Sequence, residues 1–506
     1  MMRWLIGLLV IVAAAGGGFY VAAGRAVPPT VQIEQPGAVV GQAGSLVIVA
    51  DGPGASFSAL VVAAEQDGKT IPLFDLTQPG AATLLQEGPN RLRVTRPFGK
   101  ASVPDLKAGT VHLTATVVRK ALFGLKSLTA TATHDVTVRL EPPRIAVVST
   151  HHYVNHGGAE LVVYKATPPD VRSGVRVGEV EYIGYPAAGA GLAGADPSLK
   201  VAVFALLHDQ EMNTPIVAFA RDEAGNEAKT RFIDNAFPKP FKRSRIPIDD
   251  RFLQRVVPEI LEHSPDFGLA APASEEEFLP AFLKINGELR QKNADTIAAL
   301  VAKSSASRLW KGPFVQLGNS QVEASFADHR TYLYKNKEVD QQVHLGFDLA
   351  VTSKVAVVAA NDGVVLNASW LGIYGNCIIV DHGLGVMSLY GHLSSFDVKV
   401  GDTVTRGQTI GRSGMTGLAG GDHLHFTMLV GGHAVNPVEW WDSHWMQDRV
   451  DRKMQEAGAP ATAEPAAAQA PVSDARKPRA ERPRRSAPAA PAKKGRGRQG
   501  RTHAGL

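Results

Sequence analysis

Short apolar runs with a period of two residues recur along this chain from about residue 28 to 236, separated by glycine, proline and aspartate. Examples are residues 45–50, 111–118 and 132–139. Because successive side chains of a strand point to opposite faces, these runs predict half-buried β-strands. A chain of 506 residues is too long for one hydrophobic core, so we expect several domains, most of them β.

The predicted organisation is mainly β and multidomain. Strand spacing with turn signals between the runs favours β-sandwich modules of the immunoglobulin-like type, and Pro142-Pro143 marks the seam between two of them. A helical period follows the acidic pair Asp249-Asp250. The predicted parts are a signal-anchor segment at 1–26, β-sandwich modules at 27–142 and 143–236, a small helical linker at 237–310, a strand-rich domain at 311–447, and a disordered tail at 448–506.

The N-terminus carries an uncharged apolar stretch from Trp4 to Gly24, preceded by Arg3. About 20 such residues in a helix span roughly 30 Å, the thickness of the hydrocarbon core of a bilayer. The small residues Val21-Ala22-Ala23 also suit a cleaved signal peptide. We therefore expect the chain at the cell envelope, either anchored in the inner membrane with its bulk in the periplasm or outside, or exported after cleavage.

Basic residues are concentrated at the C-terminus. From residue 471 onward there are eleven basic residues and two acidic residues. Alanine, proline, arginine and lysine dominate beyond about residue 455, and such a segment cannot bury enough apolar surface to fold. Its charge favours contact with anionic envelope polymers or lipid headgroups, although a solvated tail is the simpler interpretation. No nucleic-acid partner is expected, because aromatic residues are not interleaved with the basic ones.

Cys377 is the single cysteine, so neither an intramolecular disulfide nor a zinc site of several thiolates can form. A zinc site in this chain would need histidine and carboxylate ligands.

Histidines with the spacing of a metal site occur in the segment His423-Leu-His-Phe426. The run to Val430 predicts a strand in which His423 and His425 share one face and apolar side chains fill the other. The two histidines would lie roughly 6.5 to 7 Å apart along the strand. This separation suits one metal ligand beside one proton carrier better than two ligands of one ion.

His344 and Asp348 supply a further imidazole and a carboxylate, with Gly346 between them. In a straight strand they would be about 13 Å apart, so the chain must bend, and glycine permits the bend. Together with His425 they form a donor set that zinc accepts, with one position left for water. Such a zinc ion lowers the pKa of water toward ~7. His392 and His423 would flank that position and exchange protons with the reactants.

The motifs His344-x-x-x-Asp348, Tyr390-Gly-His-Leu393 and His423-Leu-His-Phe426 resemble, in this order, those of the lysostaphin-type (LytM-like) zinc metallopeptidases. The resemblance covers about residues 320 to 445. It implies an antiparallel β-sheet metallopeptidase domain over 311–447 that binds one Zn²⁺ through His344, Asp348 and His425. It also implies that His392 and His423 are catalytic and that the substrate is peptidoglycan, whose peptide cross-bridges are hydrolysed.

Two alternatives belong to other functional classes. A catalytically silent member of the family would bind the cell wall and activate amidases, but such proteins typically lack the zinc ligands. A biotinyl- or lipoyl-like module is suggested by the turns at Gly401 and Gly407, but no lysine of the carrier type sits in a tight hairpin there. Asp422 departs from the family pattern and could raise the pKa of His423. The absence of an obvious wall-binding repeat favours a D,D-endopeptidase of the Gram-negative type.

Overall fold

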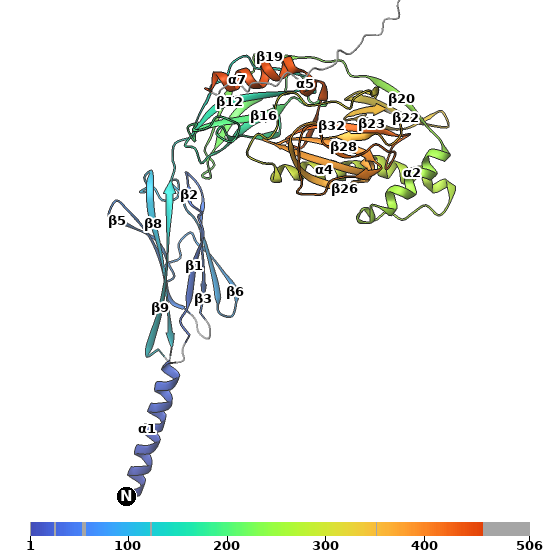
Figure 1. Cartoon of the computed structure of the whole chain (residues 1–506). Helices are drawn as coiled ribbons and strands as arrows, with labels where there is room; N and C mark the ends of the chain where they lie inside the picture. The colour runs from blue at the N-terminus through green and yellow to red at the C-terminus, as the bar shows by residue number, and fades with distance from the viewer. Residues whose placement is uncertain (1, 25–26, 53–56, 122–123, 351, 459–506) are drawn as a thin grey trace, which may run out of the picture. The chain divides into compact units, whose positions relative to one another are not determined.

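The computed structural model describes residues 2–24, 27–52, 57–121, 124–350 and 352–458 (Figure 1). Its first element is the helix α1 (Met2–Gly24). Among the described residues, no helix is long and apolar enough to cross a membrane. The predicted transmembrane anchor at 1–26 is therefore not supported, and residues 1 and 25–26 lie outside the described part.

The first β region has two sheets that share one core, in the orders β1-β3-β7-β6 and β2-β9-β8-β4-β5 (Figure 1). In β8, alternate residues are fully buried while their neighbours are not, as the period of two predicts. The strands are β1 (Thr30–Gln35), β2 (Val39–Val40), β3 (Ser45–Asp51), β4 (Phe57–Gln66), β5 (Lys69–Asp75), β6 (Thr83–Gly88), β7 (Arg91–Pro97), β8 (Gly109–Ala121) and β9 (Lys126–Val138).

The second β region has two four-stranded sheets, β10-β12-β16-β15 and β14-β13-β17-β18, and the parallel pair β11-β19. Its core is continuous with that of the domain that follows. The strands are β10 (Arg144–Val147), β11 (Tyr153–Asn155), β12 (Ala159–Thr167), β13 (Arg172–Val177), β14 (Val180–Ile183), β15 (Tyr185–Pro186), β16 (Leu199–Ala205), β17 (Ile216–Arg221), β18 (Glu227–Arg231) and β19 (Asn235–Phe237).

The helical region begins with α2 (Asp250–Glu262), where the sequence predicts a helix. The Asp249 side chain accepts a hydrogen bond of 2.8 Å from the backbone N–H of Phe252, and the apolar stripe of α2 is buried. The elements that follow are η1 (Pro265–Phe267), η2 (Glu275–Glu277), α3 (Phe278–Lys284), the π-helical turn η3 (Ile285–Leu289), α4 (Arg290–Ala299) and η4 (Leu300–Lys303). These helices share a core with Tyr332 and Ile373 of the next domain, so the predicted helical linker packs against its neighbour.

The third β region is built on an antiparallel sheet in the order β21-β24-β32-β28-β27-β26-β30, with β33 paired to β32 (Figure 1). Smaller sheets have the orders β20-β22-β23 and β25-β31-β29. The elements are β20 (Arg243–Ile248), β21 (Gln321–Ala324), β22 (Asp328–Tyr334), β23 (Lys337–His344), β24 (Phe347–Ala350), β25 (Ala356–Val358), β26 (Gly363–Trp370), η5 (Gly372–Tyr374), β27 (Asn376–Gly383), β28 (Val386–Leu393), β29 (Ser395–Phe396), β30 (Thr403–Val404), β31 (Thr409–Arg412), β32 (His423–Val430) and β33 (His433–Val435).

Helices continue past residue 447, where the sequence predicts the start of a disordered tail. They are α5 (Pro437–Trp441), α6 (Ser443–Trp445), the π-helical η6 (Met446–Asp451) and α7 (Arg452–Glu456). Val450 and Met454 are buried in the core, and this burial explains why the segment is folded despite its polar composition. The rest of the predicted tail, residues 459–506, lies outside the described part of the chain.

Candidate metal centre

The pairing of β24 with β32 brings two of the predicted ligands together. Asp348 lies directly opposite His425 in this antiparallel pair. β23 ends at His344, and the two residues before Phe347 turn the chain so that the His344 side chain returns to Asp348. The predicted bend is therefore present, and it closes the long separation that a straight strand would impose.

Three donor atoms form a small triangle at this point. His344 Nε2 lies 2.9 Å from Asp348 Oδ1 and 3.1 Å from His425 Nδ1, and His425 Nδ1 lies 3.0 Å from the same Asp348 oxygen. Within the described residues, this is the one group of three such side chains whose donors converge closely enough for a metal ion. Ligands at ~2.0–2.1 Å in a tetrahedron are about 3.3 Å apart, so the triangle fits zinc.

Hydrogen bonds on the far side of each ring orient the two histidines. The Thr427 hydroxyl donates to Leu345 O (2.9 Å), so it accepts from the Nε2–H of His425 (3.0 Å), and Nδ1 of that ring keeps its lone pair. His344 Nδ1 lies 3.2 Å from Ser325 O, to which only an N–H can donate, and Nε2 is thus left unprotonated. Both rings therefore turn a lone pair to the same point, as metal ligands require.

His392 and His423 lie beside this triangle with their ring centroids 4.9 Å apart. His423 Nε2 is 3.5 Å from Asp348 Oδ1, and its Nδ1 donates to Gly421 O (2.8 Å). His392 Nδ1 donates to Thr416 O (2.8 Å), and this residue has a φ of 61°, unusual for a side chain other than glycine. The structure thus brings together all five predicted site residues.

Comparison with known proteins agrees with this geometry. Residues 342–437, which contain all five side chains, match the model of Peptidase family M23. The chain carries an M23 peptidase domain.

Relatives of the M23 domain differ in their named roles. Over 161 residues this chain is 30% identical to the Peptidoglycan DD-endopeptidase ShyA of Vibrio cholerae. The match covers 32% of this chain and 34% of that protein. Over 95 residues this chain is 41% identical to the Murein hydrolase activator EnvC of Escherichia coli. The match covers 19% of this chain and 23% of that protein. The chain thus spans about a third or less of the length of these relatives.

Among solved structures, the catalytic domain of the antimicrobial peptidase lysostaphin from Staphylococcus simulans matches with 28% identity and a TM-score of 0.22. The match covers 25% of this chain and 96% of that chain.

The ionisable groups of the M23 site have pKa values that are shifted in different directions. Burial would raise the pKa of Asp348, but when the neighbouring rings are protonated, the charge of His344 and hydrogen bonds from the histidines hold it well below its usual value. Burial, together with the charges of His423 and His425, holds the pKa of His392 well below its usual value. Burial also opposes the charge of His423, yet the hydrogen bond to Asp348 and the charge of that carboxylate raise the pKa of His423. The two histidines outside the triangle therefore differ in their affinity for a proton.

A cavity of about 100 Å³ opens beside the five site residues of the M23 domain. Arg330 and Tyr332 both line it. Tyr374 also lines it, with its ring centroid 5.4 Å from that of His425. Trp370 instead packs, stacked 4.4 Å from the His263 ring.

Several contributors to the M23 site were not predicted. Thr427 orients His425, and its place two residues further along the same strand face is a signal that could have found it. Arg290 lines the cavity from the helical region, and no local pattern in the sequence marks it. Asp422 accepts hydrogen bonds from Ser413 Oγ (2.6 Å) and Ser353 Oγ (3.0 Å), so the structure favours a role in joining loops over one in tuning His423.

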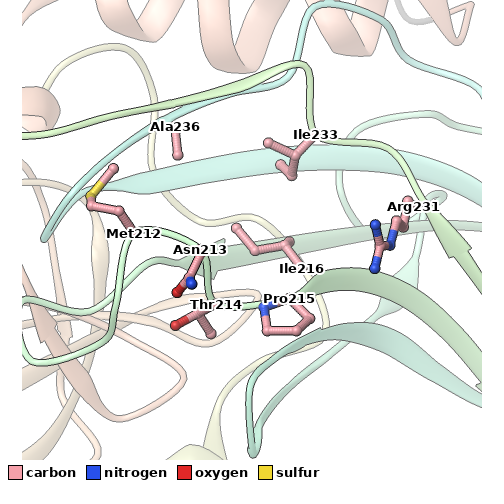
Figure 2. Close-up of a pocket in the computed structure, with 8 residues that line it drawn as sticks. All are labelled: Met212, Asn213, Thr214, Pro215, Ile216, Arg231, Ile233 and Ala236. Carbon is pink, nitrogen blue, oxygen red and sulfur yellow. The ribbon is translucent and has the colours of Figure 1, made fainter.

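Another cavity, of about 260 Å³, lies in the second β region (Figure 2). Arg231 is the one ionisable side chain in its lining, and the others are apolar or neutral (Figure 2). This cavity offers no donor set for a metal and no pair of groups for proton transfer.

Proposed function

We propose that the M23 domain is a zinc-dependent endopeptidase that hydrolyses the peptide cross-bridges of bacterial peptidoglycan. The observation that carries this proposal is the triangle of donors from His344, Asp348 and His425, which would hold one Zn²⁺. All three side chains are buried, and each imidazole is tied through its other nitrogen. Such orientation raises metal affinity, because the ligands need no reorganisation when the ion binds.

His392 and His423 would carry protons in this reaction. A zinc ion in the site would activate a water molecule and polarise the scissile carbonyl. Hydrolysis of an amide also requires one proton to leave the water and one to reach the departing nitrogen. Each of these histidines has Nδ1 bound to a backbone carbonyl, so Nε2 is the atom free to exchange protons. Their opposite pKa directions suit one acceptor and one donor.

The named relatives support the proposed substrate and place of action. ShyA is named a peptidoglycan DD-endopeptidase, and we propose the same bond class for this chain. Because peptidoglycan lies outside the cytoplasm, the M23 domain would act at the cell envelope. We also propose that the two N-terminal β regions are immunoglobulin-like modules. The basic tail would contact anionic polymers of the envelope.

A second candidate is an activator of cell-wall amidases without hydrolytic activity of its own. The identity of 41% to the Murein hydrolase activator EnvC favours it. The complete and oriented donor set favours the enzyme, because an activator needs no metal ligands.

Digestion of purified peptidoglycan by the zinc-loaded full chain, with the products identified by mass spectrometry, separates the two candidates. We expect His344→Ala to lose both zinc and cleavage, and His423→Ala to keep zinc but lose cleavage. His444→Ala is the matched control, since this histidine is exposed on α6. A wild-type chain that binds no zinc and releases no fragments, but stimulates an amidase, would establish the activator instead.

A further inference from the structure

The cavity beside the M23 site has an excess of positive charge. Its lining includes the guanidinium groups of Arg290 and Arg330 but a single carboxylate, that of Asp348. A divalent ion in the site would add two more positive charges. A small space with this balance attracts an anionic group, because the surrounding protein screens charge less than water does.

Arg330 is already engaged by that single carboxylate. Its Nη2 donates to Asp348 Oδ2 over 2.9 Å, and its Nε lies 3.7 Å from Asp328 Oδ2. The charge of Arg330 is thus paired with Asp348, the proposed metal ligand.

Arg290 forms no such pair. Its Nε and Nη2 donate to the backbone and side-chain oxygens of Asn286, over 3.0 and 2.6 Å, and both acceptors are neutral. Among the described residues, the hydrogen bonds of the Arg290 guanidinium go to Asn286 and none goes to a carboxylate. Burial raises the pKa of Tyr374, and the charge of Arg290 opposes that rise, so this charge reaches the ring that packs on His425. Arg290 therefore supplies a positive charge at the cavity that no carboxylate contacts directly; Asp340 lies behind Asn286.

The fold holds Arg290 in place. It is the first residue of α4 and directly follows the π-helical turn η3, a feature that is frequent at functional sites. Asn286 is fully buried and donates to Asp340 Oδ2 over 2.7 Å. This hydrogen bond fixes the Asn286 side chain, which in turn binds the guanidinium group of Arg290. Asn293 of the same helix accepts a hydrogen bond of 3.0 Å from the backbone N–H of Ile373, in the turn η5 that contains Tyr374. The arginine is thus positioned from two directions.

We propose that Arg290 is a specificity-determining residue that binds a free carboxylate of the peptide substrate, one residue or less from the scissile amide. This inference rests on the proposed function and names the feature of the peptide that the site selects. The hydrogen bonds to Asn286 use Nε and one N–H of Nη2, so the terminal N–H groups of the planar guanidinium can meet a carboxylate through two parallel hydrogen bonds. Pairing with the substrate would compensate the one positive charge of the cavity that the folded chain leaves unpaired.

Paired synthetic peptides test this assignment in the full chain loaded with Zn²⁺. The probes are acetyl-D-alanyl-D-alanine and its C-terminal carboxamide, which differ only in the negative charge. Their dissociation constants are compared in His423→Ala, which cannot turn the peptides over, and in the same protein with Arg290→Gln or Arg290→Lys. Glutamine keeps a donor toward Asn286 but removes the charge. Arg251→Gln on the exposed face of α2 is the control.

We expect the carboxylate peptide to bind roughly ten- to a hundredfold more tightly than the amide in the His423→Ala protein. Arg290→Gln should bring the ratio to within about twofold of one, Arg290→Lys should restore part of it, and Arg251→Gln should leave it unchanged. A ratio near one at the outset, or one that Arg290→Gln does not change, overturns the assignment. A ratio that depends on Arg290 in a chain whose wild type cleaves no peptidoglycan would sustain the subsite and reject the proposed hydrolase.

Discussion

Arg330 donates a hydrogen bond of 2.9 Å from Nη2 to Oδ2 of Asp348, while the contacts of three histidines with this carboxylate converge on its other oxygen. The carboxylate is thereby divided into an oxygen that faces the triangle and an oxygen that faces the protein. A ligand fixed in this way cannot rotate away from the metal without losing a charged hydrogen bond in a buried place.

Replacing Arg330 should weaken zinc binding without unfolding the domain. We expect Arg330→Gln to lower zinc affinity roughly ten- to a hundredfold, because Asp348 loses the partner that orients it. Competition with a chromophoric chelator measures the affinity. Arg245→Gln, on the exposed side of the neighbouring strand β20, should leave it unchanged. Equal affinities in the two variants would show that the hydrogen bond does not orient the ligand.

Gly346 has a second role besides permitting the bend. A Cβ at this position would lie 2.6 Å from Nε2 and Cε1 of His425 and from Oγ1 of Thr427. Gly346→Ala should therefore displace the His425 ring and reduce zinc content at a fixed chelator concentration, while circular dichroism stays that of the folded chain. Gly287→Ala, where an added Cβ meets nothing within 4 Å, is the matched control. Full zinc occupancy in Gly346→Ala would contradict this account.

Lys453 and Glu160 form an ion pair of 2.8 Å that is almost completely buried, with exposures of 1% and 0%. Lys453→Met should cost about 3 kcal/mol of unfolding free energy, since the buried Glu160 loses its close ion pair and keeps only the 3.5 Å contact with Arg449 and hydrogen bonds from two backbone N–H groups. The double variant Lys453→Met with Glu160→Leu should recover most of that loss. Urea unfolding followed by circular dichroism measures both. Arg452→Met, whose partner Asp448 is half-exposed, should cost less than about 1 kcal/mol.

Burial raises the pKa of Glu439 to about 7, although Asn155 Nδ2 and the backbone N–H of Ala159 each donate to it over 2.7 Å. A carboxyl group with a raised pKa binds its proton more tightly in the folded state. Its contribution to stability is therefore complete below about pH 4.5 and is lost as the pH rises to about 7. Glu439→Gln should abolish this fall, which amounts to ~2.5 kcal/mol between pH 5 and 7.5, in urea titrations at these two pH values. Parallel falls in wild type and variant would disprove the assignment.

The strand at His423–Val430 and the helix at Asp250–Glu262 were predictable, because each shows its period within a single stretch of sequence. The five residues that gather at the candidate metal centre were also predicted, since three motifs carry them at the spacing of a known family. Residues 448–456 were predicted as part of a disordered tail and are helical. Their charged residues suggest solvent exposure. Lys453 is nevertheless buried, because its ammonium group pairs with Glu160 and donates to Leu161 O, both far away in the sequence.

The linear sequence by itself determined the mainly β character of this protein, the side chains available to a metal, and the absence of any thiolate site beyond one cysteine. Only the tertiary structure decided that Arg290 borders the same cavity as the histidines and that Arg330 and Thr427 orient the proposed ligands. The physical reason is that periodicity reports which face of an element is buried. It does not report which distant elements meet there, because that depends on strand register and packing across the whole core.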